Sequence, residues 1–125
     1  MLRAVEAALK PNGRHVFYAI TLTAGISDEE RARAIRLGNE HVDAGPGHAV
    51  LMEQAGFDQV EVTDVSDGYL VTMERWIRAW QDDSVALSEL VGDEEYQARM
   101  ERQAVDIAAV KEGLLKRYLV SGVKP

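Results

Sequence analysis

The most constraining feature of this sequence is a turn that leads directly into an apolar strand. Lys10 to Gly13 (KPNG) cannot continue a helix, because proline removes a backbone donor and Asn-Gly accepts positive φ. Arg14 to Thr23 follows at once, with a nearly unbroken apolar run from Val16 to Ile20. Such runs are typical of a strand covered on both faces, as in a parallel sheet. The rest of the chain must therefore pack around a sheet.

Helical patterns flank this strand on both sides. Met1 to Leu9 has the composition of a helix that ends at the turn. Ser27 and Glu30 form a capping box, which predicts that a second helix begins there. The loop Asp43 to Gly47 (DAGPG) then leads into a short helix over His48 to Gln54. The first half of the chain thus reads as helix, strand, helix and helix.

The second half begins with another strand and continues with helices. Gln59 to Val65 alternates apolar and polar residues up to Thr63, which predicts a strand. From Gly68 onward the spacing becomes helical, and Asp82 to Ser84 interrupts it. The remaining predicted elements are a short helix that ends near Val91, a long helix that begins at Asp93, and a third strand over Leu115 to Lys124.

Composition excludes several classes of protein. The 125 residues are 46% hydrophobic and 28% charged, which suits one domain with a hydrophobic core. The absence of cysteine excludes disulfides and thiolate zinc sites. A net charge of −7, with arginines interleaved among acids, argues against a nucleic-acid partner. Because neither a signal peptide nor a membrane span is evident, we expect a cytoplasmic protein without a membrane partner.

Three segments, in this order, resemble the C-terminal half of class I S-adenosylmethionine (SAM)-dependent methyltransferases. Leu9 to Arg14 (LKPNGR) looks like the turn into the family's fifth strand, with Asn12 in place of a glycine. Leu51 to Phe57 (LMEQAGF) is similar to the helix and Ala-Gly-Phe turn before the sixth strand. Tyr118 to Pro125 (YLVSGVKP) resembles the final strand with its Lys-Pro ending.

The resemblance implies an α/β fold. We expect the C-terminal part of a Rossmann-like sheet, with Arg14 to Thr23 as a parallel-type strand, the last two strands as an antiparallel pair, and about six helices. Residues 1–125 would form a single partial domain. Its helical insertion at about 69–112 corresponds to the region that the family shapes to its substrate.

The same resemblance implies SAM as the cofactor, yet the chain lacks the family's SAM-binding motif. No Gly-x-Gly-x-Gly follows a predicted strand. Gly45-Pro46-Gly47 precedes a helix but follows no strand, so it is a loop. No cofactor-binding residue can therefore be assigned in this chain, and we expect the isolated chain to be inactive. Its first strand would also lack a neighbour, which predicts self-association or a partner chain that covers that edge.

Two groups of residues are candidates for substrate binding. Thr21 and Thr23 end the first strand, where ligands of open α/β sheets bind, although they could equally satisfy turn hydrogen bonds. The other group shares one helical stripe, which on pattern alone favours a core over a pocket. The members of this stripe are Tyr69, Met73, Trp76 and Trp80, and the resemblance raises the pocket interpretation for Tyr69 and Trp76.

His41 and His48 flank the glycine-rich loop and are the candidates for a general base, with solvent-exposed bystanders as the alternative. No histidine or carboxylate spacing indicates a metal site. We therefore expect methyl transfer from SAM to a small molecule, in which the protein mainly aligns the reactants. The alternative is a non-catalytic α/β module that binds a ligand or protein and self-associates.

Overall fold

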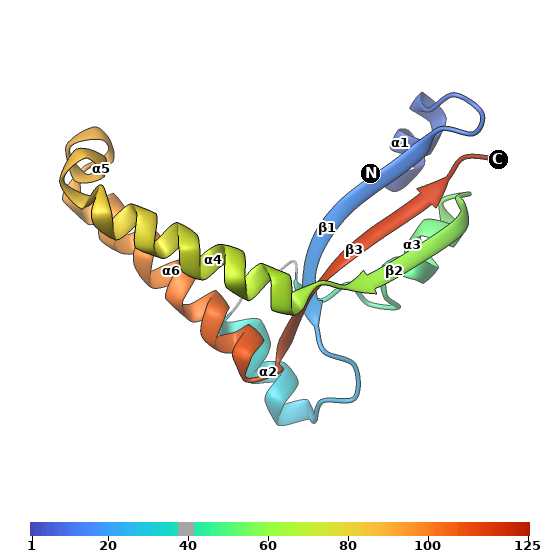
Figure 1. Ribbon diagram of the computed structural model, residues 1–125. Coiled ribbons are helices and arrows are strands. Elements are labelled where there is room, and N and C mark those ends of the chain that lie inside the picture. Colours follow the sequence, from blue (N-terminus) through green and yellow to red (C-terminus); the bar gives the residue numbers. More distant parts are fainter. Residues whose placement is uncertain (38–41) are drawn as a thin grey trace.

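The computed structural model describes residues 1–37 and 42–125 (Figure 1). The described residues form six helices and three strands in the predicted order. The elements are α1 (Leu2–Ala8), β1 (Arg14–Leu22), α2 (Asp28–Leu37), α3 (His48–Gln54), β2 (Asp58–Asp64), α4 (Ser66–Asp82), α5 (Ser84–Val91), α6 (Asp93–Lys111) and β3 (Leu115–Val123).

The turn before β1 has the predicted geometry. Asn12 adopts φ 64°, so asparagine takes the left-handed conformation that a glycine would otherwise supply. Its backbone N–H donates to the carbonyl of Lys124 at 2.9 Å. Gly13 donates to Lys10 at 2.8 Å, and its own carbonyl accepts from Lys124 at 2.8 Å. The turn is therefore tied to the C-terminal end of the chain as well as to β1.

The three strands form one sheet in the order β1-β3-β2. β3 lies in the centre and runs antiparallel to both neighbours, so β1 and β2 run parallel to each other. The expected antiparallel pair of the last two strands is thus confirmed. β1 pairs with β3 from Arg14↔Val123 to Leu22↔Leu115 and lies at the edge of the sheet. A parallel partner of β1 would have to lie along its outer edge, where the described chain places no strand.

α1 and α3 cover one face of the sheet. Met52, Phe57 and Val120 are the fully buried centre of this layer, and Leu2, Val5, Leu9 and Phe17 pack against them. Figure 1 shows both helices close to the sheet. Phe57 thus anchors the start of β2, as its place after the Ala-Gly turn predicts.

The opposite face is covered only at one end. Ile20, Leu22 and Leu115 pack there against a core that α2, α4 and α6 supply. Further along β1, Val16 is 50% exposed and Tyr18 is 59% exposed. The expectation that β1 is covered on both faces is therefore wrong for this chain. The cause is that α4 and α6 extend away from the sheet as a long hairpin with α5 at its tip (Figure 1).

β2 departs from simple alternation at its start. The register with β3 shifts between Asp58 and Glu61, and Gln59 adopts φ 49°. This is a β-bulge, which inserts one residue and moves the following side chains to the other face. After the bulge Val60 and Val62 share one face; Val60 packs against the buried Val120 layer and is half-buried, whereas Val62 is 44% exposed. The sequence shows the alternation but not the bulge, because a bulge depends on the partner strand.

Candidate functional site

A cavity of about 350 Å³ lies where the open face of the sheet meets the first turns of α4. We call it the corner pocket. Backbone contacts fix this junction, because Val65 N–H donates to the Arg117 carbonyl at 2.8 Å and Arg117 N–H donates to Ser66 Oγ at 3.0 Å. Asp64 accepts from the Ser66 N–H at 3.0 Å. The residues that line the pocket are Tyr18, Val65, Gly68, Tyr69, Thr72 and Arg117.

A guanidinium group between two tyrosine rings dominates the corner pocket. The Arg117 Cζ atom lies 4.4 Å from the ring centroid of Tyr18 and 5.0 Å from that of Tyr69. These are cation–π contacts. Burial raises the pKa of the Tyr69 hydroxyl, the Asp106 carboxylate raises it further, and Arg117 partly opposes the rise. Tyr69 therefore stays protonated at neutral pH and can donate a hydrogen bond.

A second cavity, of about 430 Å³, lies at the carboxyl end of β1; we call it the strand-end crevice. Thr21, Thr23, the loop around Gly45 to Gly47, His48 and Tyr118 line it. Thr21 Oγ1 donates to the Val42 carbonyl at 2.7 Å. Thr23 Oγ1 is buried and has no hydrogen-bond partner in residues 1–37 and 42–125. Thr21 therefore serves the local structure, whereas the Thr23 hydroxyl keeps its hydrogen-bonding capacity.

Charged and aromatic contacts hold the rim of the crevice. Asp43 forms an ion pair with Arg31 of α2 and accepts from the Gly45 N–H at 3.0 Å. The Gly45 hydrogen bond, assisted by Arg31, lowers the pKa of the Asp43 carboxyl. His48 lies edge-on to Phe17 with ring centroids 5.7 Å apart, and burial lowers its pKa. His48 is thus the neutral imidazole of the crevice at neutral pH.

The two cavities lie on opposite faces of the sheet. Arg117 lines the corner pocket and Tyr118 lines the strand-end crevice, and consecutive strand residues point to opposite faces. The structure therefore groups Thr21, Thr23 and His48 together, and it separates them from Tyr69. A reactant held against Tyr69 does not face the His48 imidazole.

The predicted stripe on α4 divides between core and surface. Met73 is 7% exposed and packs in the core with Ile107. Trp76 is 54% exposed, and its ring lies 6.3 Å from that of the half-buried Trp80. Tyr69 alone of the four lines the corner pocket. His41 lies outside the described residues.

The sequence analysis missed Tyr18 and Arg117. Tyr18 lies within an apolar strand run, and Arg117 follows Lys116 at the start of β3. The signal in the sequence was a tyrosine hydroxyl within the apolar run of β1 and a pair of basic residues at the start of β3. The contact between Tyr18 and Arg117 could not be predicted, because it depends on the register of β1 with β3.

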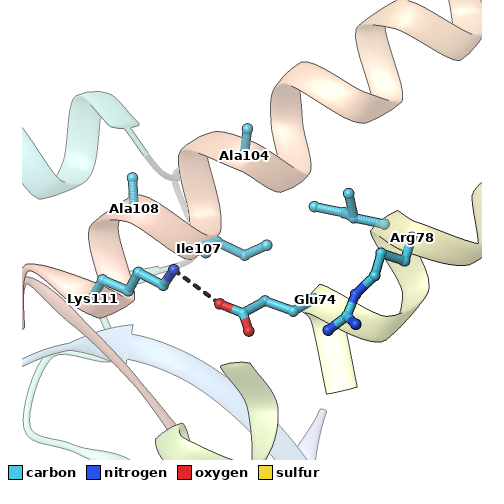
Figure 2. Close-up of a pocket in the computed structure, with 7 residues that line it drawn as sticks. Glu74, Arg78, Ala104, Ile107, Ala108 and Lys111 are labelled. Atoms are coloured by element: carbon cyan, nitrogen blue, oxygen red, sulfur yellow. Dashed lines mark ion pairs between the residues drawn. The ribbon is translucent and has the colours of Figure 1, made fainter. Parts of the chain in front are cut away.

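A third cavity, of about 510 Å³, is a groove along the helical hairpin (Figure 2). Ala104 and Ala108 of α6 are too small to fill the space beside α4, and Ile107 lies between them. Lys111 reaches across to Glu74 at 2.9 Å and lowers the pKa of that carboxyl. The groove is a packing seam between α4 and α6 that the Lys111–Glu74 ion pair bridges.

The described residues lack two features, a cluster of metal ligands and a membrane-spanning helix. In residues 1–37 and 42–125, no three or more histidine or acidic side chains are grouped so that they could hold a metal ion. Within the same ranges, no helix combines the length and apolar character needed to cross a membrane.

The arrangement of strands and helices also occurs in solved enzymes. A structure of phosphoethanolamine N-methyltransferase 2 from Haemonchus contortus, in complex with phosphomonomethylethanolamine and S-adenosylhomocysteine, matches 99% of this chain at a TM-score of 0.80 and 13% identity. A candidate sarcosine dimethylglycine methyltransferase from Galdieria sulphuraria matches 98% at a TM-score of 0.79 and 13% identity. The chain has a methyltransferase fold.

A mycolic acid cyclopropane synthase, CmaA1, shows the same fold, with 98% of this chain matched at a TM-score of 0.80 and 16% identity. No protein-family model matches the sequence, and no curated protein matches it either. The chain spans only part of these enzymes, namely 29%, 46% and 51% of the three matched chains. The predicted fold class, a part of a methyltransferase sheet, is thereby confirmed.

Proposed function

We propose that this chain is the acceptor-binding part of a SAM-dependent methyltransferase that acts on a small molecule in the cytoplasm. The observation that carries the proposal is its match over 98 to 99% of its length to about half or less of three such structures. The cofactor-binding part would then lie outside residues 1–125, either upstream in the same gene or on another chain.

The open edge of the sheet supports this division. β1 lies at the edge, and the described chain provides no partner for its outer side. The half-exposed Val16 and Tyr18 lie on the face that α1 and α3 leave uncovered. Edge strands with exposed apolar residues pair readily with other chains. We therefore propose that further strands of the enzyme, or in their absence a second copy of this chain, cover β1.

We propose that the site for SAM lies outside the described residues. Gly45 and Gly47 adopt positive φ before α3, but this turn follows no strand and α3 has only seven residues. The family's glycine-rich strand-to-helix turn is absent from the sequence. We accordingly assign to this chain only the steps that concern the acceptor.

We place the acceptor in the corner pocket. The Tyr69 hydroxyl donates a hydrogen bond that orients it, and Thr72 provides a second polar group beside Gly68. Trp76 and Trp80 continue the same face of α4 and exclude water once the rest of the enzyme is in place. Met73 packs in the same core as Tyr69 and supports it. Thr21 and Thr23 line the strand-end crevice on the other face of the sheet. Alignment of this kind is the main protein contribution to a displacement at carbon.

Titration calorimetry with SAM tests the proposal directly. We expect no measurable heat of binding from this chain alone. After co-expression with the polypeptide encoded immediately upstream of the Met1 codon, we expect SAM binding and transfer of a labelled methyl group to a small-molecule acceptor. Tight SAM binding by the chain alone would refute the assignment. An upstream sequence without a glycine-rich cofactor motif would instead favour a non-catalytic ligand-binding or protein-binding module.

A further inference from the structure

Arg117 is the single charged residue among those that line the corner pocket. Its surroundings differ from those of most basic residues with described contacts. Lys116 pairs with Asp64 at 3.4 Å, and Lys111 pairs with Glu74 at 2.9 Å. Among residues 1–37 and 42–125, no carboxylate lies within 4.0 Å of an Arg117 nitrogen. Aromatic rings take the place of a counter-charge.

The contacts of Arg117 leave its hydrogen-bond donors available. A guanidinium that lies against aromatic rings uses its faces, and its N–H groups remain in the plane for other partners. In the described part of the chain, the Arg117 side chain forms no hydrogen bond, and the bonds to Ser66 and Val65 at this residue involve its backbone N–H and carbonyl. Because Arg117 is only partly buried, these donors face the cavity and its water, and an anion that enters would take the place of that water.

The acidic group that acts on Tyr69 does not fill that role. Asp106 on α6 is close enough to raise the pKa of Tyr69, but the charge that stabilises its carboxylate is that of Arg102. The tyrosine rings hold the guanidinium at the mouth of a cavity of about 350 Å³, which is large enough for a small molecule. The Tyr69 hydroxyl adds an O–H donor to the same space.

We propose that Arg117, held between Tyr18 and Tyr69, binds an acidic group of the methyl acceptor, a carboxylate or a phosphate. The inference rests on the proposed function in so far as the bound molecule is an acceptor. Arg117 forms a bidentate pair with the anion, because its paired N–H groups match two oxygens of either group. The acceptor is therefore a small acid.

The experiment titrates the whole ¹⁵N-labelled chain with sodium phosphate and, separately, with sodium acetate. The ionic strength is held constant with sodium chloride, because surface charge effects are screened by salt. We expect saturable shifts in the Arg117 Nε–H signal and in the Gly68 and Tyr69 amide signals. The dissociation constant should be on the order of 1 to 10 mM for an anion of this size. The two titrations show which of the two anions the pocket prefers.

Variants locate the binding site. Arg117→Gln should weaken binding of the preferred anion about tenfold or more, because it removes a charge-assisted pair. Arg117→Lys keeps the charge but loses the bidentate geometry, so its affinity should be intermediate. The matched control is Arg75→Gln, which removes one charge from an exposed site on α4 outside the pocket.

Two outcomes would overturn the proposal. One is the absence of saturation by either anion, and the other is equal binding by wild type and Arg117→Gln with an unchanged backbone spectrum. The titration contains no SAM, so its result is independent of methyl transfer. Failure to bind anions would leave the proposed methyltransferase role standing, and failure of that role would leave anion binding measurable.

Discussion

At the residue scale, packing against β3 explains why Gly122 is a glycine. Its φ is not in the left-handed region, so backbone freedom is not the reason. A β-carbon at this position would lie 2.7 Å from Met52 Cε and 3.0 Å from Phe57 Cβ. Met52 is fully buried and cannot swing into solvent, and the Phe57 atom is fixed to the backbone. Close contact between α3 and the sheet thus requires a residue without a side chain.

Gly122→Ala should lower the free energy of unfolding by about 1 to 3 kcal/mol, as overpacking typically does. Gly68→Ala is the matched control, because its β-carbon would meet no atom within 4 Å and Gly68 lies within α4. That control should raise stability by about 0.5 to 1 kcal/mol, the usual gain of alanine over glycine in a helix. Urea denaturation measures both changes, and equal effects of the two substitutions would contradict this explanation of Gly122.

His48 provides a second prediction at this scale. Burial lowers its pKa below the ordinary 6.5, so the folded state binds fewer protons than the unfolded state below that pH. Its contribution to stability is complete above pH 6.5 and is lost as the pH falls from 6.5 through the folded pKa. We expect the free energy of unfolding of wild type to fall more steeply than that of His48→Gln over this window. Parallel curves for the two proteins would disprove the assignment.

At the scale of elements, α2 combines little burial with a capped N-terminus. Ala34 is the one residue of α2 that is fully buried. The predicted capping box holds the start of α2. Glu30 N–H donates to Ser27 Oγ at 3.1 Å, and Ser27 N–H donates to Glu30 Oε1 at 3.3 Å. Asp28, Glu29 and Glu30 also place negative charge at the positive end of the helix dipole.

Ser27→Ala should therefore lower the free energy of unfolding by about 0.5 to 2 kcal/mol, the range for loss of an N-cap. Ser84→Ala is the comparison, because Ser84 begins α5 and no side-chain hydrogen bond caps that helix. A surface substitution of this kind should change stability by less than about 0.5 kcal/mol. Thermal and urea denaturation distinguish the two, and a Ser27→Ala protein as stable as wild type would show that the capping box contributes nothing.

At the scale of the whole molecule, two separate cores hold one sheet. Met52, Phe57 and Val120 form the core under α1 and α3, and the second core joins α2, α4 and α6 to one end of the sheet. Neither core covers the middle of the face that contains Val16 and Tyr18. The open face and the open edge of β1 adjoin, so one partner can cover both. This is the physical basis for proposing an incomplete sheet.

The isolated chain should therefore self-associate at micromolar concentrations in sedimentation experiments. Val16→Lys places a charge beside the open edge and should shift the equilibrium toward monomer, since edge lysines oppose strand pairing. Val71→Lys is the matched control, because Val71 on α4 is 51% exposed against 50% for Val16. A wild-type chain that sediments as a monomer would contradict the prediction, and so would equal shifts by both variants.

The sequence by itself determined the order of the nine elements, the turn at Asn12, the cap at Ser27 and the fold class. These depend on local periodicity, proline and glycine chemistry and short motifs, which act between residues close in the chain. Only the tertiary structure decided which face of β1 stays open and where the bulge at Gln59 falls. It also decided that Tyr18 and Arg117 meet. Tyr18 pairs with Leu119, so Arg117 is its diagonal neighbour on β3, and only the antiparallel register of two distant strands creates that contact.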